Sequence, residues 1–100
     1  MNLQQLYELG LDMGIKADPR GADGVKKLLA RLKKEYAEFP EKKKKFFDKE
    51  NLTNPYSDSR ILNGEPGITI KRVMAGIDAD ASEVLLTDRL NEKGEKIDLL

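Results

Sequence analysis

Apolar residues recur every three or four positions through the first half of the chain, which is the spacing of one face of a helix. The first predicted helix runs from Asn2 to about Met13. Its apolar stripe consists of Leu3, Leu6, Tyr7 and Leu11. Asn2 is a suitable N-cap, and Gly14 suits the position just past the last turn.

The clearest amphipathic pattern follows a turn over residues 16–21 and predicts a helix over residues 24–38. Its apolar face consists of Val25, Leu28, Leu29, Leu32, Tyr36 and Phe39. We expect Asp23 or a neighbour to cap this helix and Pro40 to end it. Pro40 also suits the first turn of a third, short helix, in which Phe46 and Phe47 anchor an otherwise charged surface.

Residues 52–67 have a different character, because two prolines, two glycines and several Asn, Ser and Asp residues favour turns. We expect at most a short strand over residues 59–62. The loop is predicted to join the helices to the last third of the chain.

The last third alternates between extended and helical patterns. Ile68 and Ile70 alternate with polar residues, and a nearly continuous apolar run then predicts a strand that is covered on both faces. Asp80 with Glu83 three residues later forms a capping box, which fixes the start of a helix. That helix is expected to bury Val84, Leu85 and Leu90. It ends at Gly94, before a second extended segment from Lys96 to Leu100.

This order of elements predicts an α/β fold, in which N-terminal helices pack on a small mixed sheet containing a parallel β-α-β unit. We expect one domain with three parts. They are a helical leader over residues 1–50, a polar loop over residues 51–67 and the β-α-β segment over residues 68–100.

Composition excludes several kinds of site. The chain has no cysteine and no histidine, so it lacks disulfides, thiolate ligands, and the commonest general base and metal ligand at neutral pH. No stretch approaches the ~20 apolar residues of a membrane span, and the N-terminus does not read as a signal peptide. We therefore expect a cytoplasmic protein without a membrane partner.

Charge is uneven along the chain, although the formal net charge is zero. Residues 26–50 contain ten Lys or Arg against five Asp or Glu, and the remainder contains eight against thirteen. Such a split could steer an anionic partner or bring two copies of the chain together. The run from Lys42 to Lys45 beside two phenylalanines would suit nucleic acid, but no nucleic-acid motif surrounds it. A solvated helix face is therefore the expected role.

Candidate binding chemistry is confined to two places. Tyr56, Asp58 and Arg60 could line a substrate pocket, because exposed polar loops on rigid scaffolds often do. Alternatively, Asp58 and Arg60 pair with each other or with the backbone and hold the loop. Asp78 lies where strand becomes helix, a position that can approach a ligand, or it orders that turn while Asp80 caps the helix. No arrangement for nucleophilic catalysis is present, so we assign no catalytic residue.

The segment VMAGIDADASEVLLTDRLNEKGEKIDLL resembles the opening β-α-β segment of the NIF-three-like (NGG-one-interacting factor three) family. These are dinuclear-metal proteins, and some are homologues of type 2 GTP cyclohydrolase I. Residues 76–78 match a strand that ends Gly-apolar-Asp, and residues 98–100 match a second strand of the form Asp-apolar-apolar. The segments LYELGLDMGIKADPRG and LTNPYSDSRIL look like the leader of a longer branch of the family.

The resemblance implies that this chain is the N-terminal portion of a metal-binding protein, in a family of metal-dependent hydrolases or related enzymes that form ring-shaped homo-oligomers. In the family the second strand runs into a His-His-Pro motif that binds metal, whereas nothing follows Leu100 here. The divalent metal pair is thus implied for the full-length family, and we expect no metal ligand in this chain. The alternative is a non-catalytic protein-interaction or regulatory module that self-associates through its sheet edge. Whether the chain is a natural short protein or a fragment stays open.

Overall fold

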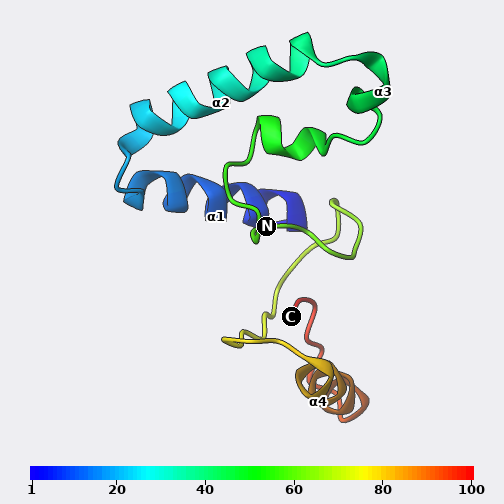
Figure 1. Ribbon diagram of the computed structural model, residues 1–100. Coiled ribbons are helices and arrows are strands. Elements are labelled where there is room, and N and C mark those ends of the chain that lie inside the picture. The colour runs from blue at the N-terminus through cyan, green and yellow to red at the C-terminus, as the bar shows by residue number, and fades with distance from the viewer. The chain divides into compact units, whose positions relative to one another are not determined.

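The computed structural model describes all residues from 1 to 100, and its regular structure is almost entirely helical (Figure 1). Helices make up 53% of the chain and strand only 4%. In chain order the elements are α1 (Leu3–Ala17), α2 (Gly21–Glu38), α3 (Glu41–Lys44), the 3₁₀ helix η1 (Lys49–Leu52) and α4 (Ala81–Glu92). The chain divides into two compact units, a helical unit (Tyr7–Leu62) and a C-terminal unit (Met1–Leu6 with Asn63–Leu100).

Helix α1 begins where the sequence predicts and runs further than expected. The Asn2 side chain accepts a hydrogen bond from the Gln5 backbone, and the Gln5 side chain accepts one from the Asn2 backbone, which confirms Asn2 as the cap. The prediction that the helix ends at Gly14 is wrong, because it continues to Ala17. Gly14 instead lies against the ring of Tyr56, and a Cβ at this position would be 3.3 Å from a ring carbon.

Helix α2 follows a short turn that Asp18 organises. The Asp18 carboxylate accepts hydrogen bonds from the Arg20 backbone and from its guanidinium. Arg20 holds the N-cap position without a side-chain cap, so Asp23 lies in the first turn and is not the cap. The helix ends at Glu38 ahead of Pro40, as predicted, and Phe39 takes up an extended conformation.

Three aromatic rings pack together after α2. Tyr36, Phe39 and Phe47 have ring centroids 5.0 to 6.4 Å apart, with two of the three pairs meeting edge to face. The Lys44 ammonium lies 5.5 Å from the centre of the Tyr36 ring. Because Phe47 turns inward, Phe46 turns outward and is 90% exposed. The expectation that both phenylalanines anchor this surface is therefore wrong for Phe46.

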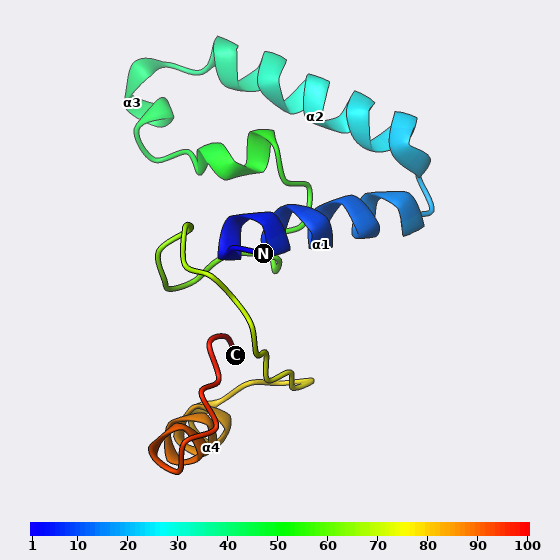
Figure 2. The ribbon, with the colours of Figure 1, turned by 180° about the vertical axis from the view of Figure 1, so that it is seen from behind.

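The interior of the helical unit is small. Val25 is fully buried on α2, and η1 packs against that helix (Figure 2). Asn54, just after η1, is only 1% exposed, so one of the two most deeply buried side chains is polar. A core this small leaves much of the stability to hydrogen bonds and ion pairs.

Helix α4 in the C-terminal unit confirms its predicted signals. Asp80 and Glu83 form the capping box, with the Asp80 backbone donating to the Glu83 carboxylate at 2.8 Å. Gly94 follows the last turn with φ at 97°, a left-handed conformation that favours glycine.

The predicted sheet and parallel β-α-β unit are absent, so the α/β assignment is wrong. Extended pairing is limited to two isolated bridges, Asn2 with Thr69 and Val73 with Leu99. No strand forms over residues 59–62 either.

Side chains take the backbone groups that a ladder of strands would use. The Asp98 carboxylate accepts hydrogen bonds from the backbone N–H groups of Lys71 and Arg72, at 2.8 and 2.9 Å. The Asn91 side chain bonds both the N–H and the C=O of Ile97. Side-chain bonds therefore replace ladder bonds and leave single bridges.

The C-terminal unit buries very little. Leu3 is its one buried apolar side chain. Val84 and Leu85 are 56% and 68% exposed, so the prediction that α4 buries them is wrong. With no sheet present, these side chains lack the surface on which they were expected to pack. No helix in the structure has the length and apolar character needed to cross a membrane.

Candidate functional site

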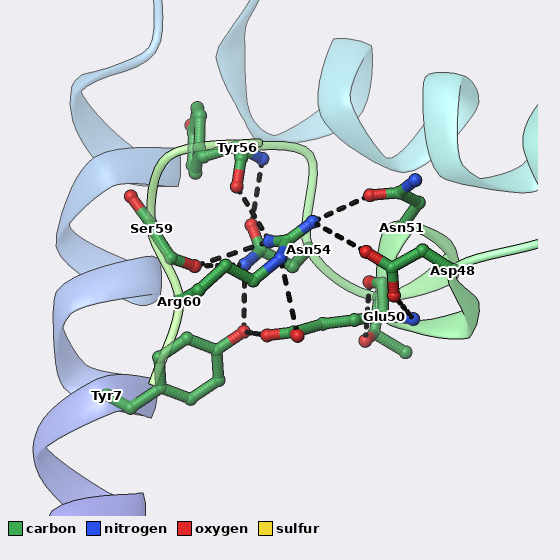
Figure 3. A network of polar contacts seen from close by, with 9 residues as sticks. Tyr7, Asp48, Glu50, Asn51, Asn54, Tyr56, Ser59 and Arg60 are labelled. Atoms are coloured by element: carbon green, nitrogen blue, oxygen red, sulfur yellow. Dashed lines mark hydrogen bonds and ion pairs between the residues drawn. The ribbon is translucent and has the colours of Figure 1, made fainter. Parts of the chain in front are cut away.

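Arg60 occupies the centre of a polar network in the helical unit (Figure 3). Its Nη1 donates to the carbonyl oxygens of Tyr56 at 2.7 Å and Ser59 at 3.3 Å. Its Nη2 donates to Asn51 Oδ1 at 2.6 Å. The guanidinium thus joins two points of the loop that follows η1 to Asn51 within η1.

Two acidic residues flank the same guanidinium. Arg60 Nε lies 3.3 Å from Glu50 Oε2, and Arg60 Nη2 lies 3.7 Å from Asp48 Oδ2. The Arg60 side chain is only 13% exposed. Every guanidinium nitrogen has a protein partner, so the N–H groups of Arg60 are already used within the fold.

Glu50 links this network to α1. The Tyr7 hydroxyl donates to Glu50 and accepts a hydrogen bond from Asn54 Nδ2 at 2.8 Å. Asn54 also donates to the Ser59 carbonyl at 2.6 Å and accepts from the Tyr56 backbone at 2.8 Å. No buried side-chain nitrogen or oxygen in the structure lacks a hydrogen-bond partner. The buried polar groups of this network are therefore all bonded to one another, and none is left without a partner.

The pKa of Tyr7 is raised above 10.0, first because the hydroxyl is buried and next because it donates to Glu50. The hydroxyl thus stays protonated at neutral pH and serves as a donor. It offers no base for proton abstraction.

A second polar group joins Tyr56 to the turn before α2. The Tyr56 hydroxyl donates to Asp18 Oδ2 at 2.8 Å, and Arg20 binds the same carboxylate at 2.8 Å. These bonds hold the pKa of Asp18 far below its usual 3.8, with the Arg20 guanidinium as the largest cause. The pKa of Tyr56 is raised, by burial first and then by Asp18. Both groups stay in their ordinary charge states at neutral pH.

The structure places the four predicted binding residues in different settings. Tyr56 and Arg60 are brought together, because the Arg60 guanidinium binds the Tyr56 carbonyl. Asp58 is exposed, and the acids that pair with Arg60 are Asp48 and Glu50. Asp78 is exposed and belongs to the C-terminal unit. A role for these residues in substrate binding stays a prediction.

Sequence reasoning missed Tyr7, Glu50 and Asn54. Tyr7 was assigned to the apolar stripe of the first helix, where its hydroxyl had no visible partner. Asn54 precedes a proline in a turn-rich loop, which suggests local backbone bonding and gives no sign of deep burial. Only long-range packing brings these residues together, since Tyr7 and Glu50 are 43 positions apart.

The residues present do not fit the divalent metal pair that the family resemblance implies. The chain has no histidine or cysteine, and no three acidic side chains gather where they could hold an ion. A dinuclear site needs several imidazole or carboxylate ligands converging on each ion. We therefore derive no chemical step through a metal.

The C-terminal unit presents a different kind of candidate, an apolar surface. Large apolar side chains from residues 63–100 that are exposed are Ile68, Val73, Ile77, Val84, Leu85, Leu86 and Leu100. Ile77 has no cover at all, with an exposed fraction of 101%. The backbone of residues 75–79 makes no hydrogen bond within the chain. Exposed apolar side chains beside a backbone with free N–H and C=O groups are typical of a surface that receives another polypeptide.

Comparison with known proteins adds no assignment, since no family model, curated protein or solved structure matches the chain. The candidate site is therefore defined by its own geometry.

Proposed function

We propose that this chain is a non-catalytic scaffold and interaction module, whose C-terminal unit receives another polypeptide on its apolar surface. The observation that supports this most directly is the exposure of seven large apolar side chains in residues 63–100. Burying one such side chain contributes about 1.5–3 kcal/mol, so covering several of them would yield a stable complex.

The open backbone indicates how the partner would be bound. Residues 75–79 make no backbone hydrogen bond, the chain bends at Ile77 and Asp78, and Ile77 is fully exposed. An extended segment of a partner could pair with these N–H and C=O groups while its side chains contact Ile77 and Val73. The sheet edge expected for this role is absent, and the unpaired segment beside α4 takes its place in the proposal.

The helical unit is assigned no ligand in this proposal. Its polar network is fully satisfied, and none of its buried groups is left for a ligand. The NIF-three-like resemblance would make the chain part of a larger metal-binding protein, and it stays a prediction.

Hydrogen exchange on the dilute monomer tests the proposed function. The amides of residues 75–79 should exchange nearly as fast as in an unfolded peptide, and a dye that binds apolar surfaces should fluoresce. Protected amides together with no dye binding in the monomer would contradict the proposal, because the surface would already be covered.

The variant V84S/L85S provides the matched comparison. It should lose most of the dye signal, whereas L62S, which removes a leucine that is 93% exposed in the helical unit, should retain it. Equal loss in both variants would locate the dye elsewhere and count against the C-terminal surface.

A further inference from the structure

The outer face of α4 combines apolar and acidic side chains. Asp88 follows Val84 by four positions and Leu85 by three, so the three share one face, and Glu92 extends it by one turn. All four are exposed. Asp88 makes no ion pair, whereas Glu92 pairs with Arg89 at 3.3 Å. We call these residues (Val84, Leu85, Asp88 and Glu92) the acidic apolar face.

A surface of the opposite character lies between α3 and η1 in the helical unit. Phe46 projects into solvent with 90% of its surface exposed, because its neighbour Phe47 occupies the ring cluster. Four lysines precede Phe46 directly, and Lys49 follows it. We call residues 42–49 the basic turn.

The charges of the basic turn are only partly used within the chain. Lys44 pairs with Glu41 at 3.5 Å, and Lys43 lies 6.0 Å from the centre of the Phe39 ring. Lys42, Lys45 and Lys49 have no acidic partner. Three free ammonium groups thus surround one exposed aromatic ring.

We infer that the partner received by the acidic apolar face is a second copy of this chain, which inserts Phe46 of its basic turn between Val84 and Leu85. This inference rests on the proposed function and names its partner. The argument is charge complementarity: an aromatic side chain rimmed by lysines matches an apolar patch rimmed by carboxylates. The units as wholes agree, since the helical unit has thirteen Lys or Arg against ten Asp or Glu, and the C-terminal unit has five against eight.

Each part of the contact has its own role. Burial of the Phe46 ring supplies most of the affinity, and salt does not screen this contribution. The exposed charges steer the two copies and set their orientation, and salt does screen them. Because two different surfaces meet, the contact is heterologous and extends head to tail into a ring or an open chain.

Sedimentation velocity across a concentration series, at low and high salt, tests the inference on the full chain. The wild type should associate, and F46S should raise its dissociation constant by roughly tenfold to a hundredfold at either salt concentration. L62S is the control for loss of an exposed apolar side chain and should associate as the wild type does.

Charge reversal gives the sharper test. K42E/K45E and D88K/E92K should each fail to associate alone at low salt, and an equimolar mixture of the two should associate again because the reversed surfaces match. K26E/K27E changes net charge by the same amount on α2, away from the basic turn, and should associate normally. Failure of the mixture to recover would overturn the inference.

Two further outcomes would also overturn it. A wild type that stays monomeric at every concentration, with residues 75–79 still open to exchange, excludes the second copy and leaves the proposed function intact. A monomer whose basic turn binds a single-stranded oligonucleotide, with binding lost in K42E/K45E, assigns that surface to nucleic acid.

Discussion

The helical unit and the C-terminal unit differ in what happens to their side chains. In the helical unit, the polar groups of Tyr7, Asn54 and Arg60 all have partners inside the fold. In the C-terminal unit, side chains such as Ile77 and Leu85 that ordinarily form a core remain exposed. The buried polar groups of the first unit are satisfied within the fold, and the second unit leaves most of its large apolar side chains exposed.

This difference separates two sources of order. Hydrogen bonds and ion pairs impose geometry on the helical unit even though its apolar interior is small. The C-terminal unit has caps and side-chain clamps that set local conformation, with little burial to support them. In this chain of 100 residues, the C-terminal unit therefore has local order with little tertiary burial to stabilise it.

The largest expected effect comes from breaking the network at its centre. R60M keeps the aliphatic stem and removes the guanidinium, which leaves the Tyr56 carbonyl without this donor and Glu50 without its ion-pair partner. We expect the helical unit to lose about 2–3 kcal/mol of unfolding free energy, less than for a fully buried pair because Asp48 and Glu50 reach solvent. Urea unfolding followed by circular dichroism measures this loss. D58N is the control, because Asp58 is exposed and has no partner, and it should unfold as the wild type does. Equal urea midpoints for R60M and the wild type would refute the central role of Arg60.

The next effect concerns the buried amide. N54A removes one donor group and one acceptor. The Tyr7 hydroxyl and the Ser59 carbonyl each lose a donor, and the Tyr56 N–H loses its acceptor. We expect a cost of about 2 kcal/mol, measured by exchange of the slowest amides in α1 and α2. S57A is the control, because Ser57 is exposed and makes no hydrogen bond. If N54A exchanged no faster than S57A, water would be satisfying these groups and the network would not be closed.

A smaller effect is expected in the C-terminal unit. D80A removes the capping box of α4 at a cost of about 1 kcal/mol. Because α4 has no buried residue to stabilise it, this loss should unfold part of the helix. Carbon chemical shifts of residues 81–92 should move toward coil values while those of α2 stay unchanged. D78A, two positions earlier and without a partner, should leave α4 intact. A simultaneous loss of α2 would show that the two units do not differ as described.

The smallest expected effect is the loss of the contribution of Asp18 to stability at acidic pH. Since the pKa of Asp18 is lower in the folded chain than its ordinary 3.8, its carboxylate stabilises the fold above pH 3.8, and that contribution is lost as pH falls through the folded pKa. The difference in unfolding free energy between wild type and D18N should therefore be constant from pH 7 to 5 and shrink below pH 3.8. A difference that grows on acidification would contradict the lowered pKa.

Signals that act within a few residues predicted the helices well. Asn2, Asp80 and Gly94 each form the cap or stop that their residue types indicate. The sheet could not be predicted in the same way, because strand pairing depends on distant residues. The Asp98 and Asn91 side chains bond backbone groups that paired strands would otherwise use. No short-range sequence pattern indicates that these side chains compete with strand pairing.

The candidate site shows the same limit. The loop containing Tyr56 and Arg60 stands out by its polar residues, but the acids that bind Arg60 come from η1 and the residue before it. Which of the adjacent residues Phe46 and Phe47 enters the ring cluster also depends on packing against Tyr36. Residue type identified the loop and the basic turn, and tertiary contacts decided which side chains are left for a partner.

The span of the network bears on when the protein can fold during synthesis. Tyr7 bonds Glu50 and Asn54, which lie 43 and 47 positions later, and Arg60 comes later still. Contacts of such long sequence separation carry a loop-closure cost and slow folding. On the ribosome, α1 and α2 emerge before the residues that hold them in place. Their apolar faces therefore stay exposed until those residues have emerged. A stalled nascent chain that stops short of Arg60 should therefore remain sensitive to protease, whereas one that exposes residues 1–62 should become resistant.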